Sequence, residues 1–357
     1  TMQLAAAGDI SKKIQAIELL ITFTQHALIK DVAFIKRALK TAEAIINNNS
    51  SPKRAHRIVI SLLSALVDND FPSSELNQEI VNIASIISSK VDEDAAFWLL
   101  LLFKKIIDKN VNQEPAKIAR MADFALQAMS SPKKSTKYTA CSLISRLIEK
   151  HLIEKHLITE ERVVSALQFP ASKPGSSHEK DVYTADTTSY LLRHNLVPKN
   201  QLDKAANILK YLVNNFSVVG NFVVFEKNPW LLLLQQDPTY STTLFATAQQ
   251  LCLSSNKVMQ QNAMYLFHIL AQADVAIEQE KIEEMVCHQL KISDLLANNL
   301  QAQRETLRFI ERLQKKNWLL SDKLRNDTLT ILNELRSLNK EDQRSVELIV
   351  QKITRVS

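Results

Sequence analysis

The chain has little glycine: of its 357 residues only three are glycine, Gly8, Gly175 and Gly220, where about 7% is usual. Loops that bind phosphate groups need several glycines close together, because backbone N–H groups must approach the anion. The two nearest glycines, Gly175 and Gly220, stand 45 residues apart. The sequence therefore contains no Walker-type loop, no dinucleotide-binding loop and no G-x-S-x-G nucleophile elbow. This argues against nucleotide-binding enzymes of the common folds.

Cysteine is also scarce. Cys141, Cys252 and Cys287 are odd in number, lie far apart and fall within apolar helical patterns. They do not resemble the paired framework of a disulfide-rich secreted domain. We expect reduced cysteines in the core and a protein that works in the cytoplasm.

Long apolar segments and aromatic platforms are missing as well. The longest fully apolar run is Ala95–Phe103, nine residues, whereas a membrane-spanning helix needs about 20. No transmembrane segment is predicted, and the N-terminal residues lack the pattern of a secretory signal. Aromatic residues make up only 6% of the chain, which argues against stacking platforms for single-stranded nucleic acid.

Charge of neither sign is concentrated. The net charge is +6, with 22 basic and 18 acidic residues through position 170 and 22 and 20 beyond it. This balance permits an acidic partner or phosphate groups, but it is unlike the basic stripe of a dedicated nucleic-acid binder.

What the chain does have is a repeating helical pattern. Abundant Leu, Ile, Ala, Lys, Gln and Glu favour an all-α fold. Six times a small or branched residue is followed by a large apolar one three and seven places later, at intervals near 40 residues: Ala16/Leu19/Phe23, Ile60/Leu63/Val67, Ala96/Leu99/Phe103, Ala140/Leu143/Leu147, Ala263/Leu266/Leu270 and Thr306/Phe309/Leu313. Residues 16 and 306 are separated by about seven steps of 41, the period of helical pairs that stack into solenoids. The pattern predicts an α-solenoid of about eight irregular pairs.

Turn signals divide the pattern into helices. Examples of predicted helices are Asp31–Asn47, Ser74–Ser88, Val91–Asn110 and Lys340–Val356. The strings Ser50–Lys53 and Ser130–Lys133 predict two further helix starts, with serine as the N-cap and proline at the first helical position.

Two segments interrupt the repeat. Pro170, Pro174 and Gly175 predict a loop or hinge over 170–182, between N-terminal repeats in 1–169 and C-terminal repeats in 183–357 of one continuous superhelix. Within 214–228, the run Phe216–Phe225 around Gly220-Asn221 fits either a two-residue β-hairpin or a distorted buried helical segment.

Two stretches carry a family resemblance. Asn256–Ala271 resembles the last helix of an armadillo repeat, with Asn, Val, Ala, Leu and a final Ala at matching intervals, and Ser130–Leu147 is similar to the second helix of a HEAT repeat. The resemblance implies a right-handed superhelix whose inner helices line a groove for extended partners. The glycine usual between the first two helices of armadillo repeats is missing, so HEAT-like or irregular repeats is the better description.

Motifs for catalysis or metal binding are weak. His151 and His156 would point about 140° apart on a helix, so they cannot share a metal ion as H-E-x-x-H does. Cys287-His288 and His178-Glu179 have no further ligands nearby. We predict no catalytic residue, no metal ligand and no cofactor.

The candidate binding residues are basic. One cluster of cations opens a predicted inner helix, a second lies at equivalent places two repeats later, and a lysine pair falls on the helix between them: Lys53, Arg54, Arg57, Lys104, Lys105, Lys133, Lys134 and Lys137. In parallel helices these would form a positive ladder along one edge of the groove. The alternative is ordinary solvated lysines, and cations at helix N-termini oppose the helix macrodipole.

From these features we expect a non-enzymatic scaffold that binds a protein partner, which could present an acidic segment. One alternative is a HEAT-like binder of phosphate groups, in nucleic acid or in acidic membrane lipid. Another is a helical-repeat enzyme whose site is built from distant residues. Helices rich in Ile, Asn, Lys and Gln also resemble those of bacterial secreted effectors that act on a host protein in the host cytosol.

Overall fold

The protein is all-α in the part of the chain that the structure describes. This computed structural model describes residues 9–26, 31–48, 50–69, 74–110, 114–168, 179–215, 228–273, 275–291, 300–319, 321–335 and 340–355. These residues contain seventeen α-helices, two short 3-10 helices and no strand. The predicted all-α class is confirmed. The hairpin alternative at Phe216–Phe225 lies outside the described residues.

The chain divides into two compact units, Thr1–Ser176 and Ser177–Ser357. The division falls inside the segment 170–182, whose role as a hinge stays a prediction. Helix α10 begins at Glu179, so the predicted loop was too long at its C-terminal end. The proline- and glycine-rich residues 169–178 lie outside the described part.

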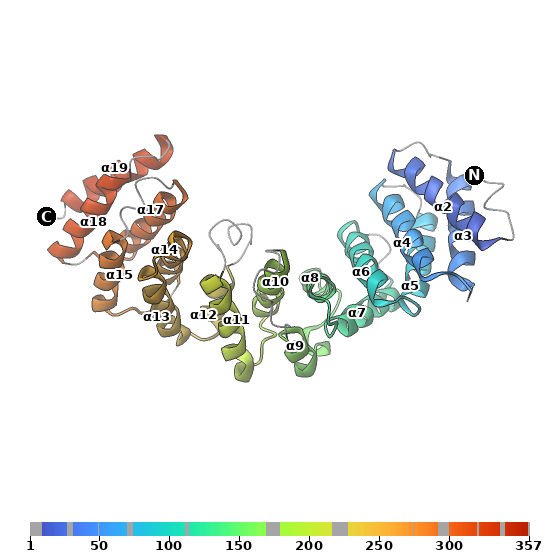
Figure 1. Cartoon of the computed structure of the whole chain (residues 1–357), viewed down its shortest axis with the longest axis horizontal. Helices are drawn as coiled ribbons and strands as arrows, with labels where there is room; N and C mark the ends of the chain where they lie inside the picture. The colour runs from blue at the N-terminus through green and yellow to red at the C-terminus, as the bar shows by residue number, and fades with distance from the viewer. Residues whose placement is uncertain are drawn as a thin grey trace. The chain divides into compact units, whose positions relative to one another are not determined.

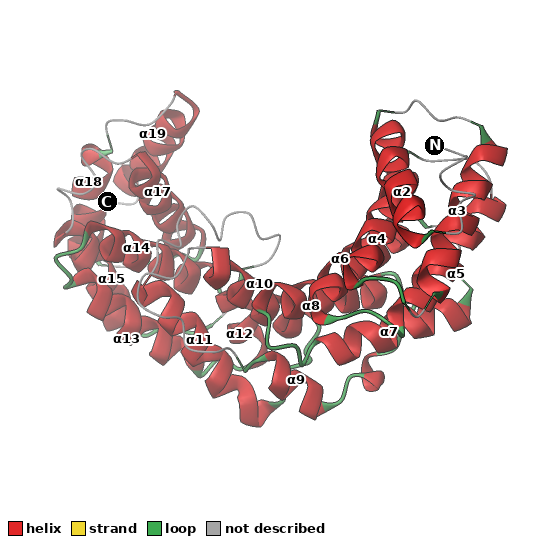
Figure 2. Ribbon diagram, turned by 45° about the vertical axis from the view of Figure 1, so that its right-hand side comes forward, coloured by secondary structure: helices red, strands yellow, loops and turns green. Residues whose placement is uncertain are grey.

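Unit 1 is built from two rows of helices (Figure 1). Its helices are α2 (Ile10–Gln25), α3 (Val32–Asn47), α4 (Lys53–Asp68), α5 (Ser74–Ser88), α6 (Glu93–Asp108), α7 (Pro115–Ala128), α8 (Lys134–Glu149), the 3-10 helix η1 (Lys155–Leu157) and α9 (Glu160–Ala166). The first row is α2, α4, α6 and α8, each packed on the next, and the second row is α3, α5 and α7 (Figure 2). Successive helices therefore alternate between rows.

Unit 2 repeats this alternation. Its helices are α10 (Glu179–Arg193), η2 (Lys199–Gln201), α11 (Leu202–Asn215), α12 (Pro229–Gln236), α13 (Tyr240–Cys252), α14 (Lys257–Gln272), α15 (Gln279–Lys291), α17 (Leu300–Lys315), α18 (Asp322–Glu334) and α19 (Lys340–Arg355). The first row runs through α10, α12, α14, α17 and α19, and the second through α11, α13, α15 and α18.

The repeated apolar triplets form much of the core, as predicted. In the five triplets after the first, every residue except the half-buried Ala96 is at most 3% exposed. The first triplet is not buried as a whole, because Leu19 and Phe23 are 45% and 38% exposed. Helix α2 instead buries Ile14, Ala16, Ile17, Leu20 and Thr24 against the helices beside it.

Adjacent repeats are also tied together by polar contacts at their helix ends. In the described residues, six side chains at or just past a helix end donate to a backbone carbonyl at the end of the preceding helix of the same row, 41 to 45 residues earlier: Asn69 to Thr24, Lys90 to Ile46, Lys109 to Val67 and Asp68, Lys150 to Ile107 and Asp108, Gln236 to Leu192, and Lys316 to Ala273. We call these contacts inter-repeat caps. The last four carbonyls of a helix lack intrahelical partners and carry the negative end of the helix dipole, so an ammonium group is a suitable donor there.

Asparagine and histidine replace glycine at helix C-termini. Asn110, His151, Asn195 and Asn317 follow α6, α8, α10 and α17, and each has φ between 53° and 55°. After His151, the N–H of Leu152 donates to the carbonyl oxygen of Leu147 at 2.9 Å, the long bond of a Schellman motif. Left-handed backbone costs about 1 kcal/mol or more without glycine, and asparagine tolerates it best. The chain thus ends helices with almost no glycine.

Two local predictions need correction. Helices α4 and α8 begin at Lys53 and Lys134, and neither has a side-chain N-cap. Ser51 instead donates to the carbonyl of Ile45 at 2.6 Å, and Ser131 donates to the Glu93 carboxylate at 2.9 Å. Both serines therefore contact a neighbouring helix, and Ser131 Oγ also accepts a hydrogen bond from the N–H of Lys133 at 3.1 Å.

The cysteines also differ from expectation at one position. Cys141 and Cys252 are buried, but Cys287 is exposed. Burial raises the pKa of the Cys141 thiol to about 12. This cysteine therefore stays a neutral thiol that packs as a small apolar side chain.

The inter-repeat caps can be tested at Lys150. Its ammonium group donates to the Ile107 carbonyl and to Asn110 Oδ1 at 2.5 and 2.6 Å. We expect Lys150→Met to lower the free energy of unfolding by about 1–2 kcal/mol, because hydrogen bonds to charged groups contribute about that much. Hydrogen exchange should speed up at the C-terminal turn of α6. Lys155→Met, at an exposed lysine of η1, is the control, and equal effects of both variants would contradict the role of the caps.

The use of a non-glycine residue in the left-handed conformation can be tested at His151. We expect His151→Gly to raise the melting temperature slightly. The left-handed conformation costs a non-glycine residue about 0.5–1 kcal/mol of folding free energy, and glycine adopts it without this cost. His156→Gly should lower it, because His156 is exposed and its φ is not positive. Thermal unfolding followed by circular dichroism measures both, and a lowered melting temperature in His151→Gly would show that the turn is not strained.

Candidate functional site

The predicted basic residues lie on three consecutive first-row helices of unit 1. Lys53 and Arg54 are the first residues of α4, and both are exposed. Arg57 lies one turn further along. Lys133 directly precedes α8, and Lys134 is its first residue. The two outer clusters therefore share the N-terminal edge of the row.

The middle of that edge is acidic. Helix α6 has Asp92 as its N-cap and Glu93 and Asp94 in its first turn. Lys104 and Lys105 lie ten or more residues further along α6, or roughly 15 Å at 1.5 Å per residue. The eight cations therefore do not form one continuous ladder. The N-terminal edge is basic at α4, acidic at α6 and basic at α8.

Asp94 joins the two basic clusters electrostatically. It forms an ion pair with Lys133, and this hydrogen-bonded contact lowers the pKa of Asp94 and raises the pKa of Lys133. Arg57 and Lys53 lower the pKa of Asp94 further. Part of the positive charge at this edge is thus balanced by the intervening carboxylate.

The lysine pair of α6 makes contacts between repeats. Lys105 donates to Ser64 Oγ at 2.8 Å and pairs with Asp68 at 2.7 Å, both on α4. Lys104 donates to Ser142 Oγ of α8 at 3.0 Å. Both are partly buried. They connect α6 to its two neighbours in the row.

Lys137 is buried rather than presented to solvent. It is 4% exposed, and its ammonium group donates to the carbonyls of Ser165 and Gln168 at 2.8 and 2.6 Å. These carbonyls lie at the C-terminal end of α9 (Glu160–Ala166). The role of Lys137 in the fold is to hold that helix end against α8.

Trp98, which the apolar pattern of Val91–Asn110 predicts in the middle of a helix packed on several sides, is exposed beside this edge. Trp98 on α6 is 39% exposed, and the Arg57 guanidinium lies 4.9 Å from its ring centroid. Phe97 packs edge-on against the same ring, with centroids 5.2 Å apart. We call Arg54, Arg57, Asp94, Phe97 and Trp98 the Trp98 surface. The signal in the sequence was the run Ala95–Phe103, which is apolar on more sides than a single buried face needs.

Unit 2 contains a buried polar network between α14 and α17. Glu305 is 1% exposed, and its two carboxylate oxygens contact His268 Nδ1 at 2.9 Å and Arg308 Nη1 at 2.8 Å. Nearby, Asn262 donates to the Val213 carbonyl of α11 at 2.7 Å. Buried polar groups of this kind are stable only when they are hydrogen-bonded. These contacts join α14 to α17 and to α11.

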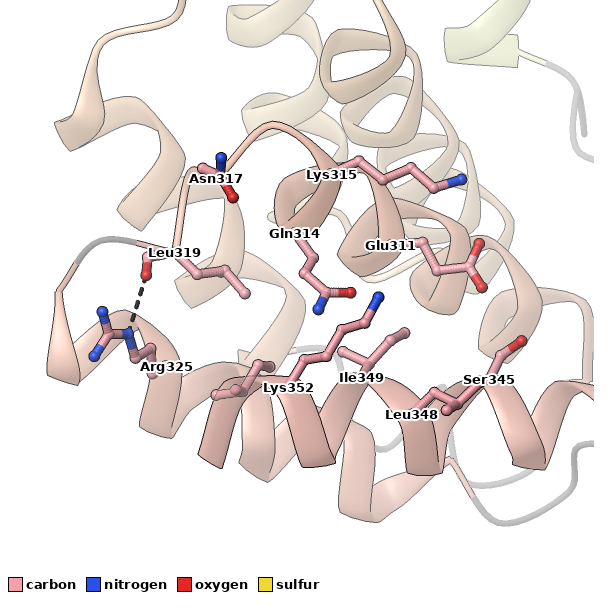
Figure 3. A pocket seen from close by; sticks show the side chains of 11 residues that line it. Glu311, Gln314, Lys315, Asn317, Leu319, Arg325, Ser345, Leu348, Ile349 and Lys352 are labelled. Atoms are coloured by element: carbon pink, nitrogen blue, oxygen red, sulfur yellow. Dashed lines mark hydrogen bonds between the residues drawn. The ribbon is translucent and has the colours of Figure 1, made fainter. Parts of the chain in front are cut away.

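A cavity of about 770 Å³ lies between α17, α18 and α19. Figure 3 shows Glu311, Gln314 and Lys315 on one wall and Ser345, Leu348, Ile349 and Lys352 on the other. Arg325 at the end of the cavity donates from Nε to the Leu319 carbonyl at 3.1 Å. No feature of the sequence alone had marked this position.

The described residues contain no group of three or more His, Cys, Asp or Glu side chains placed to hold a metal ion. None of their helices is both long enough and apolar enough to cross a membrane. His151 and His156 are both exposed and lie in a turn and in η1 rather than on one helix.

Comparisons with known proteins give no family. No family model matches the chain, and no curated protein matches it. Among solved structures, the crystal structure of an engineered protein from a structural genomics consortium aligns over 95% of this chain and 97% of its own, at 11% identity and a TM-score of 0.19. A TM-score of this size does not show a shared fold, and nothing is inferred from it.

The different roles of the basic residues can be tested by charge reversal. We expect Lys137→Glu to lower the free energy of unfolding by about 3 kcal/mol or more, because it places a carboxylate against two carbonyl oxygens in a buried site. Arg54→Glu should change it by about 0.5 kcal/mol or less, since Arg54 is exposed. Chemical denaturation of unit 1 measures both. Equal stability of the two variants would contradict the assignment of Lys137.

Proposed function

We propose that the chain is a non-enzymatic helical-repeat scaffold that binds a protein partner through the Trp98 surface. The architecture we propose is a right-handed α-solenoid of eight irregular, HEAT- or armadillo-like pairs, from α2/α3 to α17/α18, with α19 following. Its support is the alternation of helices between two rows in each unit and the polar contacts at one-repeat spacing. A cytoplasmic site of action is part of the proposal.

The observation that carries the binding role is the exposed Trp98 with Arg57 stacked on it. Tryptophan and arginine are the residues most enriched at the energetic centres of protein interfaces. An indole with 39% exposure leaves apolar area for a partner, and the stacked guanidinium keeps its N–H groups available for a carboxylate. The surrounding charges form the polar rim that interfaces usually have.

The charges around Trp98 favour a partner with an acidic segment. Arg57 contacts the ring, and Lys53 lies one turn earlier on α4. Asp94 already pairs with Lys133. A carboxylate of the partner would meet exposed cations of α4, whereas a basic segment would meet a carboxylate that already has a partner. We therefore expect an acidic residue next to an apolar one in the segment that contacts Trp98.

Fewer cations are available to bind phosphate than the sequence suggested. Lys104, Lys105, Lys133 and Lys137 all contact groups of unit 1 itself. The exposed cations of α4 remain, beside the acidic first turn of α6. A phosphate backbone needs several free cations in succession, so a protein partner fits this surface better.

The proposal can be tested with Trp98→Ala. Loss of a central tryptophan costs about 2 kcal/mol or more of binding, or roughly thirtyfold in Kd. We expect affinity capture with this variant to lose a protein that the wild type retains in stoichiometric amount. Leu253→Ala, at a 76% exposed leucine of unit 2, is the control and should retain it. Equal recovery with wild type and Trp98→Ala would contradict the proposal, provided circular dichroism shows both variants folded.

A further inference from the structure

The cavity between α17, α18 and α19 has the composition of a ligand site. All its lining residues belong to unit 2 and lie in the described part of the chain. Its volume of about 770 Å³ is within the range of roughly 300–1,000 Å³ that is usual for small-molecule sites. Such sites are mostly apolar, with a few polar groups at fixed places.

An ion pair joins α17 and α19 near their N-terminal ends. Arg304 of α17 pairs with Asp342 at the start of α19 at 3.2 Å. Among the described residues, no hydrogen bond or ion pair joins Glu311, Gln314 or Lys315 to α19. In unit 1 the corresponding ends are joined, for example by Arg146 and Asp108 at 2.5 Å. The C-terminal halves of α17 and α19 therefore leave a space.

The inner part of this space is apolar. Ile349 and Ile353 are each 4% exposed and form its floor on α19. Leu319 lies on the opposite side, and Leu348 at the opening is 58% exposed. An exposed leucine beside an apolar floor loses unfavourable contact with water when an apolar chain covers it. The body of the ligand is therefore apolar.

The opening is positively charged. Lys352 extends from α19 across the gap toward Gln314, whereas Lys315 extends from α17 along the rim, with its ammonium group directed away from Lys352 (Figure 3). Both lysines are exposed. Arg325 is held by the Leu319 carbonyl and by Asp322, at 3.1 and 3.2 Å. Glu311 is the one carboxylate among the lining residues, so the two lysines leave a positive excess for a ligand.

We propose that this cavity binds an amphipathic organic anion, with its acid group at the ammonium group of Lys352, Lys315 adding positive charge at the rim, and an unbranched apolar chain over Leu348, Ile349 and Ile353. The acid group can be the carboxylate of a free fatty acid or the phosphate of a lipid, because both chemistries accept charge-assisted hydrogen bonds from an ammonium group. This site lies in unit 2, does not include Trp98 and does not depend on the protein-binding proposal.

Calorimetric titration of the full chain with decanoate tests the proposal. We expect saturable binding of one decanoate per chain, and a parallel titration with decyl phosphate shows which acid group is preferred. Binding should weaken at least tenfold in Leu348→Asp and in the double variant Lys315→Glu/Lys352→Glu. Leu253→Asp, at another exposed leucine of the same unit, should bind like the wild type. Acetate should not bind because it lacks the apolar chain, and decyltrimethylammonium should not bind because it lacks the acid group.

Three results would overturn the proposal. They are no saturable heat with either anion at millimolar concentration, equal affinity in the wild type and in both cavity variants, or equal affinity for the cationic decyl compound. Circular dichroism checks that the cavity variants are folded, which is expected since the substituted side chains are exposed. Trp98→Ala should leave decanoate binding unchanged, so failure of this site and failure of the protein-binding proposal are separate outcomes.

Discussion

The fold depends on how each helix end finds donors for its last carbonyls. A stack of short helices presents many such ends, and each leaves four carbonyls without an intrahelical partner. In this chain the following repeat supplies a donor, as Lys109 does for Val67 and Lys150 does for Ile107. The donor is an ammonium group in most cases, so it also balances the negative end of the helix dipole. Apolar packing holds the rows together, and the inter-repeat caps align the C-terminal ends of neighbouring helices.

This arrangement explains the mild basic character of the protein. Lysines that look like surface residues in the sequence contact carbonyls or carboxylates of neighbouring helices, as Lys90 and Lys105 do in the preceding repeat. Lys137 is buried because its ammonium group donates to carbonyls at the end of α9. The cations that remain on α4 gather beside Trp98. The recognition surface is therefore marked by the exposed cations that the fold does not use in its own ion pairs and hydrogen bonds. The net charge of the chain does not show where these cations lie.

Sequence periodicity predicted the core well because burial on one helix face is a local property. It correctly marked Leu99, Leu143, Leu266 and Phe309. It failed at Leu19 and Phe23, since α2 packs on α4 on one side and no earlier helix of its row is among the described residues. The candidate sites were less predictable. The partner of a lysine 41 residues away depends on which helix ends lie side by side. The cavity beside α19 depends on how α17, α18 and α19 pack together, which no sequence motif records.

The inter-repeat caps also give the array a direction. Each cap is donated by the later repeat to the earlier one, from Asn69 to Thr24 through Lys316 to Ala273. Loss of a repeat on the C-terminal side therefore removes donors from the helix ends that remain, whereas loss on the N-terminal side removes only acceptors, and the freed ammonium groups turn to water at little cost. In a linear array whose stability is a sum of neighbouring interfaces, this asymmetry makes the two ends unequal. Within each unit, fraying should travel more easily from the C-terminal end than from the N-terminal end.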